Sequence, residues 1–274
     1  MSVEVERKFV CNPDIQKKLT GIGAVCVGQC QFHDQYYDSP GFHLTLNDVW
    51  LRCRQGSWEL KCPATEKQQG MEENQGERLC TRYKEITSLP QIIAKVREVM
   101  KEACEEQNRQ TFPPVENEVK ECNDQGHRRE TLVTNYCNEP CIKQGDAAKD
   151  KVVGSKDANR CCVENGGDLA WLREMNLAPF AEFTTERCSF LLDAEGKEGG
   201  VRVDLDQADF GYCVGEIEVL VSEGHAVQSA MKKIERTAHR LGLSDDQKVE
   251  GKMHVYLQRY CPEHYAKLLS AHIL

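Results

Sequence analysis

The stretch Glu4-Val5-Glu6-Arg7-Lys8-Phe9 decides the fold, because its side chains separate into two kinds when they alternate between the faces of a β-strand. Glu4, Glu6 and Lys8 share one face, and Val5 and Phe9 lie on the other with Arg7. Two carboxylates beside an ammonium suit an interior that binds ions, because glutamate oxygens hold hard divalent cations and lysine meets phosphate. In this segment alone, an exposed strand with solvated charges would give the same pattern.

The same alternation recurs in later parts of the chain, which weakens the interpretation as an exposed strand. The charged positions that share a face are Arg52 with Arg54 and the neighbouring Trp50, Glu59 with Lys61, Glu85 in Tyr83-Lys84-Glu85, Arg202 with Asp204 and Asp206, and Glu216 with Glu218. Several strands that carry both signs of charge on one face predict a closed sheet with a polar interior, whose apolar faces pack outward under helices. A small barrel is normally filled by apolar side chains, so a charged interior requires a ligand.

The remaining pattern predicts helices around this sheet and one long interruption. Apolar spacing favours a helix after Ser88 that fades near residue 106, a short helix over 169–175, a helix over 227–241 that ends at Gly242, and further helices between 249 and 269. The residues at about 108–167 are polar and without periodicity, which predicts a disordered insertion. The order of strands, helix, loop, strands and helices indicates a single α+β domain over 1–274.

Composition limits the partners and the compartment. No stretch of the 274 residues approaches the ~20 apolar residues of a membrane span. Glu4 and Glu6 stand where a signal peptide would be apolar, so we expect a cytoplasmic protein, taken as a monomer. The net charge of −9 argues against a nucleic-acid or membrane partner. A small anionic substrate would have to be attracted by a local basic cavity.

The two sets of charges together suit a metal–polyphosphate complex. Guanidinium groups bind phosphate oxygens in pairs, and lysines act as point charges. Carboxylates repel phosphate, so their natural partner is a bridging Mg²⁺, with Mn²⁺ as an alternative. The sequence contains no Gly-x-x-x-x-Gly-Lys-Ser/Thr loop, which excludes a P-loop enzyme.

The ordered set of motifs resembles the CYTH superfamily of triphosphate tunnel metalloenzymes. The motifs are Glu4-x-Glu6-x-Lys8, Tyr36-Tyr37-Asp38, Trp50-Leu51-Arg52-x-Arg54, Trp58-Glu59-Leu60-Lys61, the run 203–212, Gly215-Glu216-Ile217-Glu218 and Val255-Tyr256-Leu257-Gln258-Arg259. Within the superfamily, the tryptophans and Phe210-Gly211-Tyr212 favour the thiamine-triphosphatase branch. The resemblance covers residues 3–106 and about 178–270, and it lapses over 108–167.

The resemblance implies a closed antiparallel β-barrel of about eight strands with helices packed outside. It implies Mg²⁺-dependent hydrolysis of the terminal phosphoanhydride of thiamine triphosphate. It assigns metal binding to Glu4, Glu6, Asp204, Glu216 and Glu218, and it assigns substrate binding to Lys8, Arg52, Arg54, Lys61, Arg187 and Lys252, with Asp204 and Glu216 beside them.

The organic group of the substrate requires a contact of another kind. Trp50 has the strand parity of Arg52 and Arg54, so its indole should face the same cavity and stack on a cationic ring; a purely structural tryptophan is the alternative. Lys61 is predicted to be catalytic. Tyr36 is predicted either to join the aromatic platform or to serve Lys61 as a catalytic proton-relay partner.

Two other functions stay open on the sequence. Another enzyme of the superfamily, such as an inorganic triphosphatase or a class IV adenylate cyclase, would share the phosphate-binding residues. A polyphosphate-binding protein without turnover would keep the barrel but lack a metal carboxylate, and the sequence retains all five.

Overall fold

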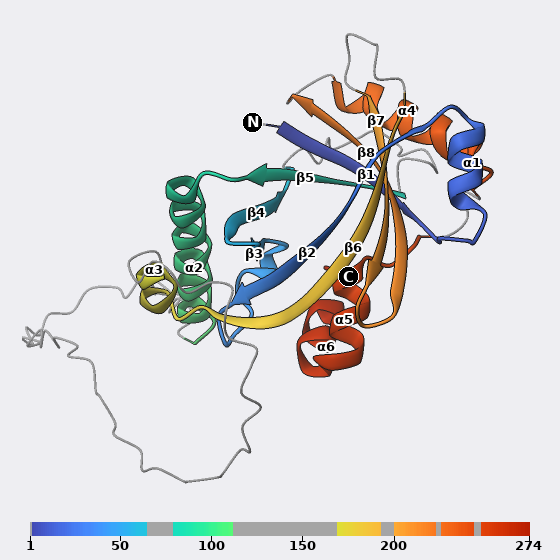
Figure 1. Cartoon of the computed structure of the whole chain (residues 1–274). Coiled ribbons are helices and arrows are strands. Elements are labelled where there is room, and N and C mark those ends of the chain that lie inside the picture. The colour runs from blue at the N-terminus through green and yellow to red at the C-terminus, as the bar shows by residue number, and fades with distance from the viewer. Residues whose placement is uncertain (1, 65–78, 112–168, 193–199, 223–225, 244–247) are drawn as a thin grey trace, which may run out of the picture.

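The chain forms a closed antiparallel β-barrel, as the sequence predicted (Figure 1). The computed structural model describes residues 2–64, 79–111, 169–192, 200–222, 226–243 and 248–274. Its strands are β1 (Ser2–Phe9), β2 (Val25–Asp38), β3 (Trp50–Arg54), β4 (Ser57–Pro63), β5 (Cys80–Ile86), β6 (Ala178–Leu192), β7 (Val201–Ala208) and β8 (Tyr212–Ser222). They close in the order β1-β5-β4-β3-β2-β6-β7-β8, so no edge is left open along this sheet.

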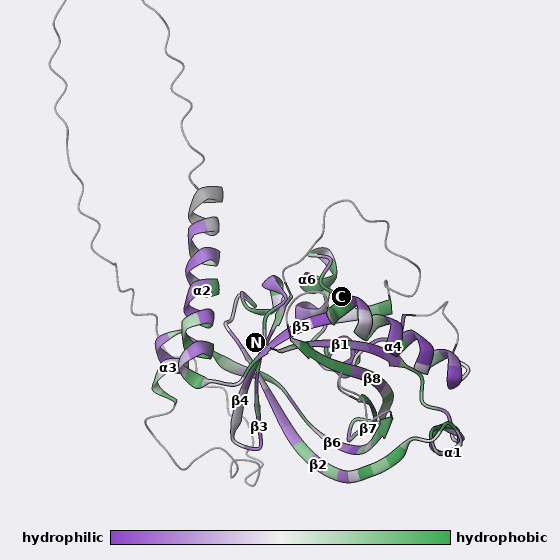
Figure 2. Ribbon diagram, turned by 90° about the horizontal axis from the view of Figure 1, so that it is seen from above, coloured by the Kyte–Doolittle hydropathy of each residue, from purple (hydrophilic) through white to green (hydrophobic). Residues whose placement is uncertain are grey.

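Helices pack on the outside of the barrel. They are α1 (Ile15–Gly21), the short 3₁₀ helix η1 (Thr45–Asn47), α2 (Leu89–Thr111), α3 (Ala170–Glu174), α4 (Ala226–Arg240), α5 (Lys252–Tyr260) and α6 (Pro262–Ser270). The long helices α2 and α4 lie on opposite sides of the barrel (Figure 2). In the described part of the chain, no helix combines the length and the apolarity needed to cross a membrane.

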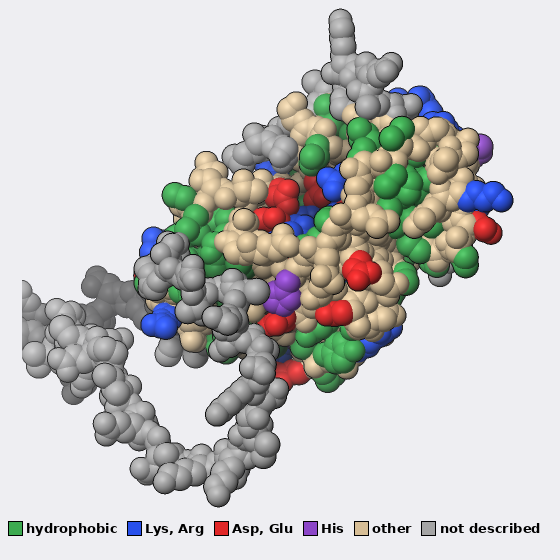
Figure 3. Space-filling model, viewed as in Figure 1, with side chains coloured by type: hydrophobic (Ala, Val, Ile, Leu, Met, Phe, Trp, Pro, Cys, Tyr) green, Lys and Arg blue, Asp and Glu red, His purple; other side chains and the backbone are tan. Residues whose placement is uncertain are grey.

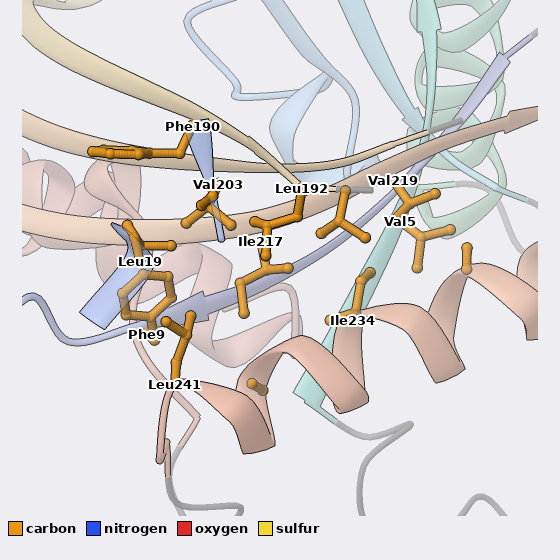
Figure 4. Packing of buried hydrophobic residues seen from close by; sticks show 14 of the residues in the cluster. Val5, Phe9, Leu19, Phe190, Leu192, Val203, Ile217, Val219, Ile234 and Leu241 are labelled. Carbon is orange, nitrogen blue, oxygen red and sulfur yellow. The ribbon is translucent and has the colours of Figure 1, made fainter. Parts of the chain in front are cut away.

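The two larger hydrophobic cores lie outside the barrel wall, because the apolar faces of most strands point away from the interior. One core packs β1, β6, β7 and β8 against α1 and α4; Val5, Val203, Ile217 and Ile234 are among its fully buried residues (Figure 4). A second core packs β3 and β4 against α2 and α3. A smaller cluster lies on the inward face of β2 and β6, where Tyr36, Ala181 and Phe183 pack with Met253 and Tyr256 of α5. Each fully buried aliphatic side chain contributes about 1.5–3 kcal/mol, so the fold is stabilised mainly from outside the barrel.

A glycine allows the first of these cores to pack tightly. Gly215 on β8 pairs with Phe9 on β1, and a Cβ atom at Gly215 would lie 2.1 Å from the Phe9 ring. Because the backbone itself fills that contact, only glycine fits opposite the phenylalanine.

Two expectations differ from the described structure or fall outside it. The backbone of α2 stays helical to Thr111, beyond residue 106, where its apolar periodicity fades. Two glutamines and an arginine in this last part, Gln107, Arg109 and Gln110, are good helix formers and can continue a helix without an apolar face. The predicted insertion at about 108–167 lies outside the described residues, except for its first four positions, which belong to α2.

Candidate active site: a charged barrel interior

The charged faces of the strands point into the barrel, as the hollow lined by acidic and basic side chains shows (Figure 3). Strand register places the two signs on different parts of the wall. The acidic residues Glu4, Glu6, Asp204, Glu216 and Glu218 come from the adjacent strands β1, β7 and β8, and the basic residues Arg52, Arg54, Lys61 and Arg187 come from β3, β4 and β6. Lys8 on β1 and Lys252 at the start of α5 add two ammonium groups.

The acidic part of the wall is buried and compact. Glu6 pairs with Glu218 across β1 and β8, and Asp204 pairs with Glu216 across β7 and β8. All five carboxylates are at most 8% exposed. Burial, followed by the charges of Glu4 and Asp204, raises the pKa of Glu218 to about 8. A cation among these groups would remove the repulsion that raises this pKa.

The acidic and basic groups neutralise one another inside the barrel. Lys8 contacts Glu6, Lys61 contacts Glu4, and the Arg52 guanidinium lies 2.5 Å from Glu59. The burial of Glu6 would by itself raise its pKa, but the charges of Lys8 and Lys61 outweigh burial and hold that pKa well below its usual range. Phosphate could replace the carboxylates around the lysines and arginines, and a cation could replace the ammonium groups around the acids.

Arg187 makes the densest of these contacts. Its Nε and Nη2 donate to the two carboxylate oxygens of Asp206 at 2.6 and 2.7 Å, and Nη2 also donates to Glu216 at 3.1 Å. Its Nη1 lies 2.5 Å from Asp204 Oδ2. Asp204 and Asp206 are at most 2% exposed, so one guanidinium holds three carboxylates that water does not compensate.

Lys252 occupies a strongly cationic part of the interior. It is buried and contacts Asp206 from the first turn of α5. Burial, with the nearby charges of Arg187 and Arg54, lowers the pKa of Lys252 well below its ordinary value. A bound anion would stabilise the protonated form of this lysine.

Trp50 faces the interior and is held in place by hydrogen bonds. It pairs directly with Lys61 across β3 and β4. Its indole Nε1 donates to Asp48 Oδ1 at 2.8 Å, and the Tyr83 hydroxyl donates to the same oxygen at 3.1 Å. The half-buried indole is therefore oriented by a carboxylate.

Tyr36 lies beside Arg52 rather than beside Lys61. Register pairs Tyr36 with Arg52 across β2 and β3, and their side chains are hydrogen-bonded. The ring stacks on Phe183 with centroids 5.8 Å apart. Burial and the positive charge of Arg52 would lower the pKa of Lys61, but the neighbouring glutamates outweigh them and raise it. Arg52 therefore links the two predicted catalytic residues.

Two further interior residues were missed by sequence reasoning. Asp34 on β2 is fully buried and accepts hydrogen bonds from Arg54 Nε and Nη2 at 2.7 and 2.9 Å. Phe32 lies under two guanidinium groups, with its ring centroid 3.9 Å from Arg54 Cζ and 5.3 Å from Arg187 Cζ. Both share the strand parity of Tyr36, and this parity is the signal that could have revealed them.

The acidic wall fits a hard divalent cation by its chemistry. Among the described residues, no three Asp, Glu, His or Cys side chains converge as a preformed metal site. Asp204 Oδ2 is nevertheless buried and accepts no well-aligned hydrogen bond from the described part of the chain, although Arg187 Nη1 lies close to it. This oxygen and the neighbouring glutamates are the hard oxygen donors that Mg²⁺ and Mn²⁺ prefer.

Comparison with known proteins identifies the family. Residues 2–251 match the CYTH domain. A thiamine-triphosphatase from Homo sapiens is 32% identical over 272 residues, covering 98% of this chain and 90% of the human protein, and one from Macaca fascicularis is 31% identical over 273 residues, with the same shares covered. The solved structure of the PH1819 protein from Pyrococcus horikoshii OT3 superposes with a TM-score of 0.49 at 15% identity, covering 93% of this chain and 98% of that one. Given the span of the domain match and of these relatives, the chain belongs to the CYTH family.

Proposed function

We propose that this protein is an enzyme that hydrolyses the terminal phosphoanhydride of thiamine triphosphate, giving thiamine diphosphate and phosphate, with Mg²⁺ as its metal. The observation that carries the proposal is that five buried carboxylates on β1, β7 and β8 and the basic residues of β3, β4 and β6 line the inside of one closed barrel. The similarity to two thiamine-triphosphatases over 98% of the chain supports the choice of organic group.

The basic residues would hold the triphosphate chain. Arg52, Arg54 and Arg187 can each bind two phosphate oxygens, and Lys8 and Lys252 add single positive charges. The present partners of these residues are carboxylates, whose geometry resembles that of phosphate oxygens. Binding therefore exchanges one set of anions for another and needs little movement of the guanidinium groups.

The acidic residues would hold the metal. Glu4, Glu6, Asp204, Glu216 and Glu218 lie on three adjacent strands and would together hold the cation. The metal would polarise the phosphoryl oxygens and neutralise charge that develops in the transition state. A water held by one of these carboxylates would attack the terminal phosphorus in line with the bond that breaks.

Lys61 would act at the transferred phosphoryl group. It stands between Glu4 on the acidic side and Arg52 on the basic side, so its ammonium can stabilise charge on an oxygen shared by both. Tyr36 would act on Lys61 through Arg52, since its hydroxyl is bonded to that guanidinium. Trp50, next to Lys61, would stack on the thiazolium ring of the substrate.

The proposal is tested by initial rates of phosphate release from thiamine triphosphate, ATP and inorganic triphosphate, each with excess Mg²⁺. We expect kcat/KM to be highest for thiamine triphosphate, with thiamine diphosphate as the organic product. Equal rates on all three substrates would indicate a general triphosphatase. Pyrophosphate and a cyclic nucleotide formed from ATP would indicate a cyclase. Tight binding without turnover would contradict an enzymatic role.

A further inference from the structure

Asp48 stands at a special position next to the predicted stacking residue. It follows η1 in the left-handed region, with φ 56° and ψ 30°, and a single residue separates it from β3. Aspartate and asparagine tolerate this conformation better than most residues. Asp48 is half-buried, so its carboxylate is only partly solvated.

The two oxygens of this carboxylate differ. Oδ1 accepts both hydrogen bonds, from Trp50 Nε1 at 2.8 Å and from the Tyr83 hydroxyl at 3.1 Å. Oδ2 has no hydrogen-bond or ion-pair partner among the residues that the structure describes. Oδ1 therefore orients the Trp50 indole, and Oδ2 remains available to accept a hydrogen bond beside it.

The surroundings of Asp48 leave its charge poorly compensated. Burial raises the pKa of Asp48, and the two hydrogen bonds and the charge of Lys248 offset burial only in part. A cationic group placed against Oδ2 would supply the missing compensation. A phosphate group would be repelled there, so this carboxylate cannot serve the triphosphate end of a ligand.

We propose that Asp48 is a specificity-determining residue, whose Oδ1 fixes the Trp50 indole and whose Oδ2 contacts the cationic or amino-bearing organic group of the substrate. The inference rests on the proposed function and adds a counter-ion to it. Thiamine carries a thiazolium cation and an aminopyrimidine, and either could lie between the indole face and Oδ2. Inorganic triphosphate has no organic group. The adenine of ATP is uncharged, so its amino group could at most donate a hydrogen bond to Oδ2 and would gain no ion pair there.

The decisive variant is Asp48→Asn. Asparagine keeps the Oδ1 acceptor for Trp50 and Tyr83 and tolerates the left-handed backbone, but it removes the charge and replaces Oδ2 by a donor. We expect KM for thiamine triphosphate to rise on the order of tenfold, between the effect of an exposed ion pair and that of a buried charged hydrogen bond. KM for inorganic triphosphate should be unchanged or slightly lower. Inhibition by thiamine alone should weaken in parallel.

Two comparison variants separate charge from structure. Asp14→Asn makes the same change on an exposed residue before α1 and should leave all substrates unaffected. Tyr83→Phe removes one hydrogen bond to Oδ1 but keeps the charge, and it should change the preference between substrates less than Asp48→Asn does.

The outcomes distinguish the two proposals. If the wild-type protein prefers thiamine triphosphate and Asp48→Asn keeps that preference, the role of Asp48 is refuted while the function stands. An equal loss on thiamine triphosphate and inorganic triphosphate would make Asp48 merely structural and also refute the inference. If the wild-type protein itself shows no preference for thiamine triphosphate, the proposed function fails first.

Discussion

Arg187→Met should destabilise the ligand-free protein strongly, because one guanidinium compensates Asp204, Asp206 and Glu216 at distances of 2.5–3.1 Å. Removing one partner of a buried ion pair typically costs about 3–5 kcal/mol, since the remaining charges stay buried and uncompensated. Arg202, which lies 3.0 Å from Asp204, and Lys252, which contacts Asp206, both stay in place, and this favours the lower end of that range. A loss of about 3 kcal/mol lowers the melting temperature of a domain of this size by roughly 6–12 °C.

The assay is thermal unfolding of paired variants with and without Mg²⁺. Arg97→Met is the matched control, because Arg97 also binds both oxygens of a carboxylate, that of Glu174, but in an exposed ion pair expected to contribute at most about 1 kcal/mol. Adding Asp206→Asn to Arg187→Met should recover part of the loss. Millimolar Mg²⁺ should stabilise Arg187→Met more than the wild-type protein. Equal melting temperatures for Arg187→Met and Arg97→Met would refute the reasoning.

Four further predictions test the site. Glu4→Gln should fold normally but lose about two orders of magnitude in kcat, which is the effect expected when a charge-stabilising group is removed. Full activity of the folded variant would mean that Glu4 has only a structural role. EDTA should abolish phosphate release and excess Mg²⁺ should restore it, whereas activity that survives chelation would contradict a metal mechanism. Trp50→Ala should raise KM for thiamine triphosphate and spare inorganic triphosphate, and equal losses on both would make Trp50 structural. The free energy of unfolding should fall as the pH drops from about 6.5 to about 4, because burial and the Lys267 charge lower the pKa of His264 to about 4. Among the described residues, its buried Nδ1 has no acceptor for a second proton. The loss is at most roughly 3 kcal/mol, and urea titrations at several pH values should show a flatter profile for His264→Gln.

The period-two pattern predicted the interior because each strand that carries the five carboxylates repeats charged residues at alternate positions. Glu4, Glu6 and Lys8 are recognisable for this reason. Phe32 and Asp34 were missed because the inward face of β2 mixes an aromatic ring, a carboxylate and a phenol, which no single pattern describes. Their function appears only when β3 supplies Arg54 as a neighbour.

Strand order and turns could not be predicted from local sequence. The contact between Lys61 and Glu4 depends on the place of β5 between β1 and β4, which is a property of the closed sheet. Asp48 lies in a left-handed turn outside any strand, so neither helical nor strand periodicity marks it. The predicted partnership of Tyr36 and Lys61 ignored Arg52, because register rather than sequence distance decides which side chains are adjacent.

The placement of the two larger hydrophobic cores outside the barrel wall bears on how such a protein can evolve. Along most strands, alternate residues have different roles: one packs against a helix outside the barrel, and the next faces the interior where the ligand would bind. A substitution on the inner face can therefore alter the accepted organic group while the neighbouring apolar residues preserve the architecture. New specificities would be reached through small changes at alternate positions, without rebuilding the scaffold.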